Sequence, residues 1–147
     1  MPMPTRELFA RMIKCEAGGE GINGMEAVAS TIMNRVHVAY GEYLRVGQGD
    51  LRRVLEQPGQ FDCLRTTLRG VPNPQNVWNI SPDQIHYDVA DWALAGNVHP
   101  GVVDTLWYMN PFVPECPPYF PYNRAGVQLN RVVQHCFFIP TSLYALT

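Results

Sequence analysis

Two helical patterns separated by a glycine-rich break open the chain. Apolar residues recur at helical spacing from Phe9 to Ile13, and Glu16 occupies the next position of the same face. Gly18 and Gly19 end this helix, which places Glu16 in its last turn. Burial and the carbonyl end of the helix dipole both disfavour a carboxylate, so we expect the pKa of Glu16 to be raised toward the range of a general acid. The alternative is that Glu16 lies at the edge of this face and points to solvent.

Length and charge limit the classes of function. The chain has 147 residues and a formal net charge of -2, which favours a single domain over residues 1–147 and provides no basic surface for nucleic acid or an anionic membrane. The first residues lack a basic region followed by an apolar run, and no stretch approaches the roughly 18 apolar residues of a membrane span. We therefore expect a protein made in the cytoplasm without a signal peptide.

The cysteine and glycine patterns argue against metal and nucleotide sites. No Cys-x-x-Cys spacing occurs among the four cysteines, Cys15, Cys63, Cys116 and Cys136. A structural zinc site is therefore not expected, and no pattern indicates another cofactor. The glycines after Glu16 follow no strand and precede no Gly-Lys-Ser/Thr, so they do not form a phosphate loop. Buried free thiols are the default expectation for the cysteines, with one disulfide as the alternative.

Capping residues and apolar spacing predict a mainly helical chain with a little sheet. Four helices are expected, at about residues 6–17, 23–36, 51–57 and 82–95. Two strands are expected, over residues 106–109 and 127–138, and loops over 41–49 and 111–122. The second loop is stiffened by prolines and carries Tyr119, Phe120 and Tyr122. These aromatic rings either stack on a sugar or a partner, or pack back onto the core.

An acid at a helix end, combined with amides, a tyrosine and a histidine from other segments, resembles the parts of a glycan-cleaving site. The residues that we expect to contact a substrate around Glu16 are Glu20, Asn34, Gln60, Tyr108, Asn110 and His135. A second carboxylate is usual in glycoside hydrolysis, and Glu20 is the nearest in sequence, although it can equally bond backbone amides of the turn. Glu16 alone suffices if it protonates the glycosidic oxygen and then accepts a proton from the sugar's own hydroxyl.

A Cys-His amidase or peptidase built on Cys15 and His135 is the rival interpretation. A catalytic thiolate prefers a helix N-terminus, whereas Cys15 falls near a C-terminus and beside Glu16. Both features raise the pKa of a thiol, which favours the glycan-cleaving interpretation.

Several motifs, in the same order along the chain, resemble those of the SleB/CwlJ-type cell wall hydrolases, the spore cortex-lytic enzymes, and the CwlJ branch in particular. They are Glu16-Ala17-Gly18-Gly19-Glu20-Gly21, Asn34-Arg35-Val36, Gln57-Pro58-Gly59-Gln60-Phe61, and in the tail Leu106-Trp107-Tyr108-Met109-Asn110-Pro111, Glu115-Cys116-Pro117-Pro118, Tyr122-Asn123 and the run from Gln134 to Thr141. Together they span roughly residues 6 to 142.

The resemblance implies an α+β, mainly helical domain, lysozyme-like or lytic-transglycosylase-like, with a small antiparallel sheet. It implies an enzyme that degrades the peptidoglycan of the spore cortex during germination, with the family's catalytic acid at Glu16. Lytic transglycosylation is associated with the SleB side, and a muramidase-type cleavage is the other option. Location at the boundary of spore coat and cortex, a coat partner protein, and a link between Cys116 and Cys136 are also implied. A catalytically silent coat protein that only binds cortex is the alternative.

Overall fold

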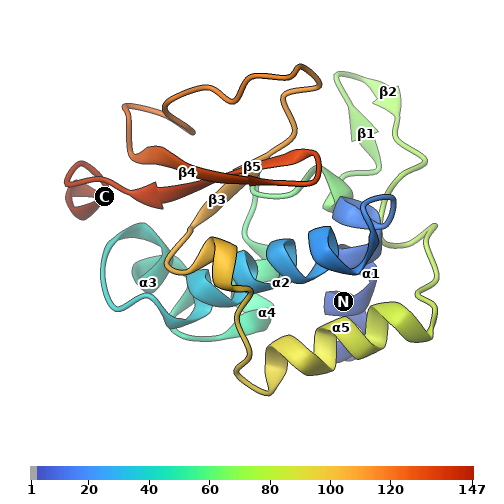
Figure 1. Ribbon diagram of the computed structural model, residues 1–147. Coiled ribbons are helices and arrows are strands. Elements are labelled where there is room, and N and C mark those ends of the chain that lie inside the picture. The colour runs from blue at the N-terminus through green and yellow to red at the C-terminus, as the bar shows by residue number, and fades with distance from the viewer. Residues whose placement is uncertain (1–2) are drawn as a thin grey trace.

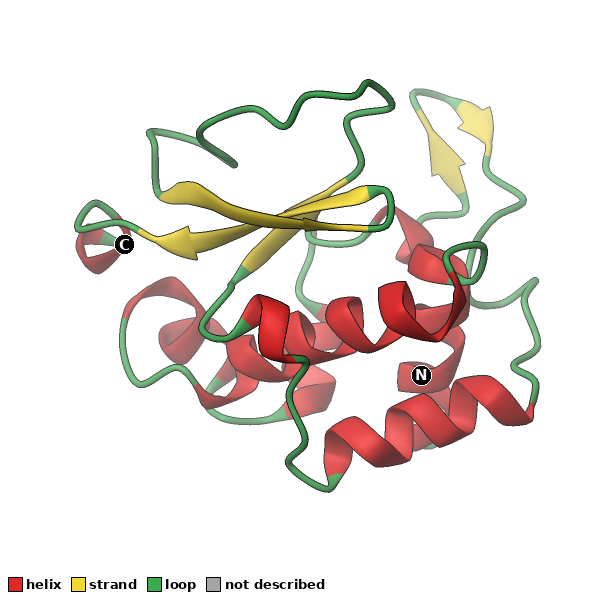
Figure 2. Ribbon diagram, viewed as in Figure 1, coloured by secondary structure: helices red, strands yellow, loops and turns green. Residues whose placement is uncertain are grey.

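The computed structural model describes residues 3–147, in which a group of helices lies beneath a small antiparallel sheet (Figures 1 and 2). The α-helices are α1 (Thr5–Ala17), α2 (Gly21–His37), α3 (Gly41–Gly47), α4 (Leu51–Glu56) and α5 (Gln84–Leu94). The main sheet has the strand order β3-β5-β4, from β3 (Trp107–Met109), β4 (Gly126–Val132) and β5 (His135–Pro140). A second hairpin pairs β1 (Thr67–Leu68) with β2 (Val71–Pro72), and short 3₁₀ turns are η1 (Asp62–Leu64), η2 (Pro100–Val102) and η3 (Tyr144–Leu146).

Helix α2 is the centre of the fold. Buried residues occur on every side of it, because α1, α4 and α5 pack around it and the sheet covers the remaining face. Gly21 begins the helix with a φ of 73°, a conformation that favours glycine. The helix starts two residues before the expected residue 23, and the Asn23 side chain contacts His99. At the start of α5, Asp83 and His86 form a capping box.

Two segments form secondary structure that differs from the predicted one. Residues 41–49, predicted as a loop, form α3, because Tyr43 is fully buried against Trp107 and Tyr144. The strand predicted over residues 127–138 is a hairpin of β4 and β5, with its turn at Val133 and Gln134. Val133 adopts a φ of 54° in this turn, which lies between the last residue of β4 and His135 at the start of β5.

All four cysteines are paired, which corrects the expectation of free thiols. Cys15 in the last turn of α1 is bonded to Cys63 in η1, and Cys116 in the Pro-rich loop is bonded to Cys136 on β5. The second bond is the link that the family resemblance implied. Each disulfide thus joins a loop region to a regular element that carries buried side chains.

None of the helices within residues 3–147 combines the length and the apolar character that crossing a membrane requires.

Candidate active site

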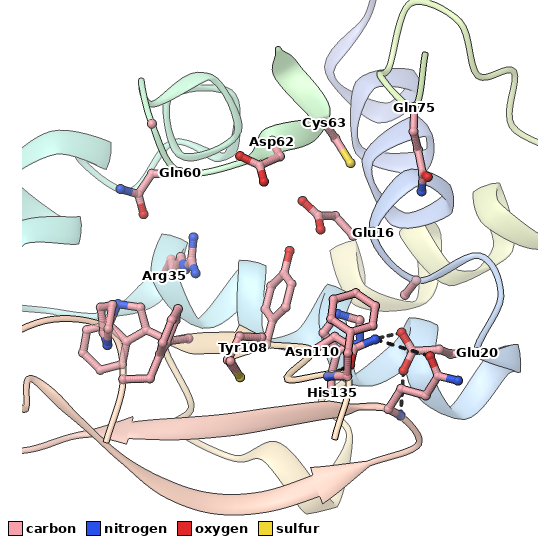
Figure 3. Close-up of a pocket in the computed structure, with 18 of the residues that line it drawn as sticks. Glu16, Glu20, Arg35, Gln60, Asp62, Cys63, Gln75, Tyr108, Asn110 and His135 are labelled. Atoms are coloured by element: carbon pink, nitrogen blue, oxygen red, sulfur yellow. Dashed lines mark hydrogen bonds and ion pairs between the residues drawn. The ribbon is translucent and has the colours of Figure 1, made fainter. Parts of the chain in front are cut away.

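An open cavity of about 860 Å³ lies between the end of α1, the η1 segment and the edge of the main sheet (Figure 3). Its polar lining includes Glu16, Glu20, Arg35, Gln60, Asp62, Gln75, Tyr108, Asn110, Gln134 and His135. Besides Tyr108, its aromatic lining includes Tyr43, Trp107, Phe112, Phe120 and Tyr122. The cavity has the size of a ligand site, and carboxyl groups and flat aromatic rings on its walls are typical of sites that bind sugars.

Glu16 stands in this cavity at the end of α1, partly buried, with its carboxyl directed into the open space (Figure 3). Its carboxyl forms no hydrogen bond or ion pair with any other residue in the part of the chain that the structure describes, residues 3–147. The pKa of Glu16 is raised to about 7, because burial, with a smaller contribution from the charge of Asp62, outweighs the lowering by His135 and Arg35. The carboxyl is therefore partly protonated at neutral pH, as its place on the apolar face of the helix predicted.

Tyr108 on β3 brings a hydroxyl to the same place. The hydroxyl is buried, has no hydrogen-bond partner within residues 3–147, and is directed toward Glu16 in Figure 3. Burial, with a further contribution from the charge of Glu16, raises the pKa of Tyr108 well above its ordinary value. The hydroxyl of Tyr108 therefore remains protonated, and it can donate a hydrogen bond to the carboxyl of Glu16 or to a substrate atom that this carboxyl contacts.

Arg35 is a site residue that the sequence did not single out. The residue is only 5% exposed, and its Nε donates a 2.6 Å hydrogen bond to the carbonyl of Leu106. It lies 4.8 Å from the ring centroid of Tyr43 and 5.8 Å from that of Tyr108, and its Nη1 has no hydrogen-bond partner among the described residues. Positive charge is thus held beside Glu16, which eases the ionisation of that carboxyl.

Glu20 holds the hairpin turn of the main sheet. Its two carboxylate oxygens lie 2.9 Å from the backbone N–H of Gln134 and 2.5 Å from Nδ1 of His135. Gly24 makes room for it, since a Cβ at that position would lie 2.5 Å from the Cβ of Glu20. Glu20 therefore bonds a turn far away in sequence and not its own glycine turn. Its oxygens are already engaged, which disfavours it as a second catalytic carboxylate.

His135, Gln60 and Asn110 line the cavity as expected, each held by a neighbour. The ring of His135 also meets that of Tyr108 edge to face at 5.3 Å. Gln60 accepts a 2.8 Å hydrogen bond from the hydroxyl of Tyr43. Asn110 accepts one from the backbone of Phe112. In residues 3–147 no three His, Cys, Asp or Glu side chains gather as a metal-binding group.

Asn34 is a correction to the expected substrate contacts. It does not line the cavity, and its amide donates to the carbonyls of Val102 and Thr105 at 3.2 and 2.9 Å. The side chain therefore fastens α2 to the η2 segment. Of the three aromatic rings of the Pro-rich loop, Phe120 and Tyr122 reach the cavity, whereas Tyr119 lies beneath Arg124 on the surface.

The raised pKa of Glu16 predicts a stability cost at high pH. The pKa in the folded protein, about 7, exceeds the ordinary value of 4.5, so the stability linked to its proton is complete below about pH 4.5 and is lost as the pH rises through 7. Glu16→Gln cannot ionise and is expected to be more stable than the parent by up to about 3 kcal/mol above neutral pH, and equal to it in acid. Thermal melts of both proteins across this range provide the measurement. A difference that does not change with pH would contradict the shift.

Comparison with known proteins identifies relatives across nearly the whole chain. A family model described as Cell Wall Hydrolase matches residues 19–138. The cell wall hydrolase CwlJ of Halalkalibacterium halodurans is 30% identical over 139 residues, which cover 92% of this chain and 85% of that protein. The cell wall hydrolase CwlJ of Bacillus subtilis is 26% identical over 136 residues, covering 92% of this chain and 85% of its own length.

Two solved structures share the fold. The catalytic domain of the germination-specific lytic transglycosylase SleB from Bacillus anthracis matches with a TM-score of 0.64 and 20% identity, over 91% of this chain and 93% of that one. The catalytic domain of Bacillus cereus SleB matches with a TM-score of 0.61 and 20% identity, over 91% and 88%. The predicted α+β, mainly helical, lysozyme-like fold with a small antiparallel sheet is confirmed.

Proposed function

Because the chain belongs to the cell wall hydrolase family, as its motifs predicted, we propose that it cleaves the glycan backbone of spore cortex peptidoglycan during germination, with Glu16 as the catalytic acid. The observation that carries this proposal is the carboxyl of Glu16, which stands unpaired among residues 3–147 in a large open cavity and has a pKa near 7. The names of the relatives support the substrate, since they are cell wall hydrolases and a germination-specific lytic transglycosylase.

In the proposed reaction Glu16 first acts as an acid. Its proton passes to the glycosidic oxygen while the bond from that oxygen to the sugar's anomeric carbon breaks. Arg35 stabilises the carboxylate that remains, and the hydroxyl of Tyr108 can donate a hydrogen bond to it. The carboxylate then accepts a proton either from the sugar's own hydroxyl, which closes an internal ring, or from a water molecule.

The remaining lining residues are proposed to hold the glycan. Phe112 and Tyr122, the exposed aromatic rings of the cavity lining, offer flat faces on which sugar rings can stack. Gln60, Asn110 and His135 supply donors and acceptors at the cavity wall. Glu20 fixes His135 through Nδ1, so the other ring nitrogen, Nε2, is the one available to a substrate. Glu20 thus serves the substrate through His135 and not by direct contact.

The amidase alternative loses its nucleophile in this structure. The sulfur of Cys15 is bonded to that of Cys63, and the ring of His135 is paired with Glu20. Neither residue is therefore available as an activated thiolate and base pair. A catalytically silent coat protein that only binds cortex remains the second hypothesis.

From the resemblance to the CwlJ branch, we also propose that the protein lies at the boundary of spore coat and cortex and has a coat partner protein.

Digestion of purified spore cortex by the protein, followed by mass spectrometry of the fragments, tests this proposal. Cleavage of glycan strands is expected, with new saccharide ends and peptides still attached to muramic acid. Release of free peptides from intact glycan would instead support an amidase. Binding to cortex with no new ends of either kind would support the silent coat protein.

A further inference from the structure

We propose that Asp62 is a second catalytic carboxylate, which removes a proton from water and so makes the enzyme a hydrolase that leaves free reducing ends. The inference deepens the proposed function and rests on glycan cleavage by Glu16. It chooses between the two fates that a single carboxylate leaves open, internal ring closure and attack by water.

A covalent link places the two carboxyl residues next to each other. Cys15 directly precedes Glu16, and Cys63 directly follows Asp62. The two cysteines form a disulfide with their Cα atoms 6.2 Å apart, so the end of α1 and the start of η1 are joined at this point. Both carboxyl groups line the cavity, and in Figure 3 they face each other across it.

The carboxylate of Asp62 is free to act on water. It is exposed, and within residues 3–147 its side chain makes no hydrogen bond and no ion pair. Its backbone is fixed, because its carbonyl accepts hydrogen bonds from the N–H of Arg65 at 2.9 Å and the amide of Asn73 at 3.2 Å. An anchored backbone with an unpaired side chain is the arrangement expected of a base that must reach a solvent molecule.

The two carboxyl groups occupy contrasting environments, which assigns their roles. Glu16 is partly buried and has a raised pKa, as an acid requires, and Asp62 is open to solvent, as the activation of water requires. Asp62 lies close enough for its charge to raise the pKa of Glu16. Asp62 therefore favours the protonated state that Glu16 needs in order to act as an acid.

The step balances with water as the only co-reactant. Glu16 gives its proton to the leaving glycosidic oxygen, whose bond to the anomeric carbon breaks. Asp62 takes one proton from water, and the water oxygen forms the new bond to that carbon. The product carries a free reducing end, and proton exchange with solvent restores both carboxyl groups. Without Asp62, the sugar's own hydroxyl attacks instead and leaves an anhydro end.

The ratio of reducing to anhydro ends in cortex digests tests the proposal. Wild type is expected to give mainly reducing ends that carry oxygen from isotopically labelled water. In Asp62→Asn the ratio of reducing to anhydro ends is expected to fall about tenfold or more, because the amide keeps the shape but accepts no proton. Asp62→Glu, which keeps a carboxylate, should recover part of the ratio. Asp88→Asn removes the same charge from an exposed position on α5, outside the cavity, and should leave the ratio unchanged.

Three outcomes would overturn the inference. Wild-type digests with only anhydro ends, or an unchanged ratio in folded Asp62→Asn, would remove Asp62 from the reaction while leaving glycan cleavage by Glu16 in place. Absence of any glycan cleavage by wild type would overturn the proposed function as well. Melting curves establish that each variant is folded. If Asp62→Asn is not folded, the wild type and Asp62→Glu decide: only anhydro ends in both digests would count against Asp62.

Discussion

Glu16→Gln is expected to lower cortex lysis by about a thousandfold or more while the protein remains folded. The amide fills the same volume in the cavity but has no proton to give to the glycosidic oxygen. No ion pair or hydrogen bond is lost within residues 3–147, because the carboxyl has none there. The loss should therefore appear in the rate of cleavage and not in the melting temperature, which is expected to rise at high pH.

Turbidity loss of cortex suspensions, followed by counting of new saccharide ends, measures this effect. Glu115→Gln provides the matched control, since Glu115 is exposed and lies outside the cavity. Activity of Glu16→Gln within a few fold of wild type would remove Glu16 from the mechanism. Full binding of the Glu16→Gln variant to cortex, with no cleavage, would separate the chemical role of Glu16 from a role in substrate binding.

Removal of the Cys15–Cys63 bond is expected to have the largest effect on stability. The bond joins residues 48 apart in sequence, and closing a loop of this size restricts the unfolded chain by about 4 kcal/mol. At roughly 3 °C per kcal/mol for a chain of this length, Cys15→Ala combined with Cys63→Ala should lower the melting temperature by about 12 °C. The Cys116–Cys136 bond spans 20 residues and corresponds to about 3 kcal/mol, so its removal should cost less.

Melting curves of the two double variants, with and without reductant, give the comparison. The parent should melt lower in reductant than in its absence, and each double variant should lose only the part of that difference that its own bond supplied. Identical melting with and without reductant, together with four titratable thiols in the native protein, would show that the cysteines are free.

The local sequence pattern was sufficient to predict features that depend on one face of a single helix. The position of Glu16 followed from its spacing after Ile13 and from the glycines behind it, and its raised pKa followed from burial on that face. The hairpin turn at Val133 was not predictable in this way, because no Gly, Asn or Asp marks it. It is held by Glu20, which lies 114 residues from Gln134 in sequence.

The other missed features share that cause. Arg35 follows Asn34 in a helix, and only the packing of Tyr43 and Tyr108 around its guanidinium makes it a cavity residue. Cys15 and Cys63 are 48 residues apart in sequence, and no rule of cysteine spacing predicts that the fold brings them together. Long-range contacts of this kind depend on the complete fold and are not visible in any window of the sequence.

The bonds of Glu20 also govern when the site is complete during synthesis. The acid Glu16 emerges from the ribosome before the hairpin turn that Glu20 fastens, because that turn and His135 follow more than a hundred residues later. A nascent chain therefore carries its proton donor long before it has a cleft to hold a glycan. The catalytic surface is consequently incomplete until the hairpin of β4 and β5 has been synthesised.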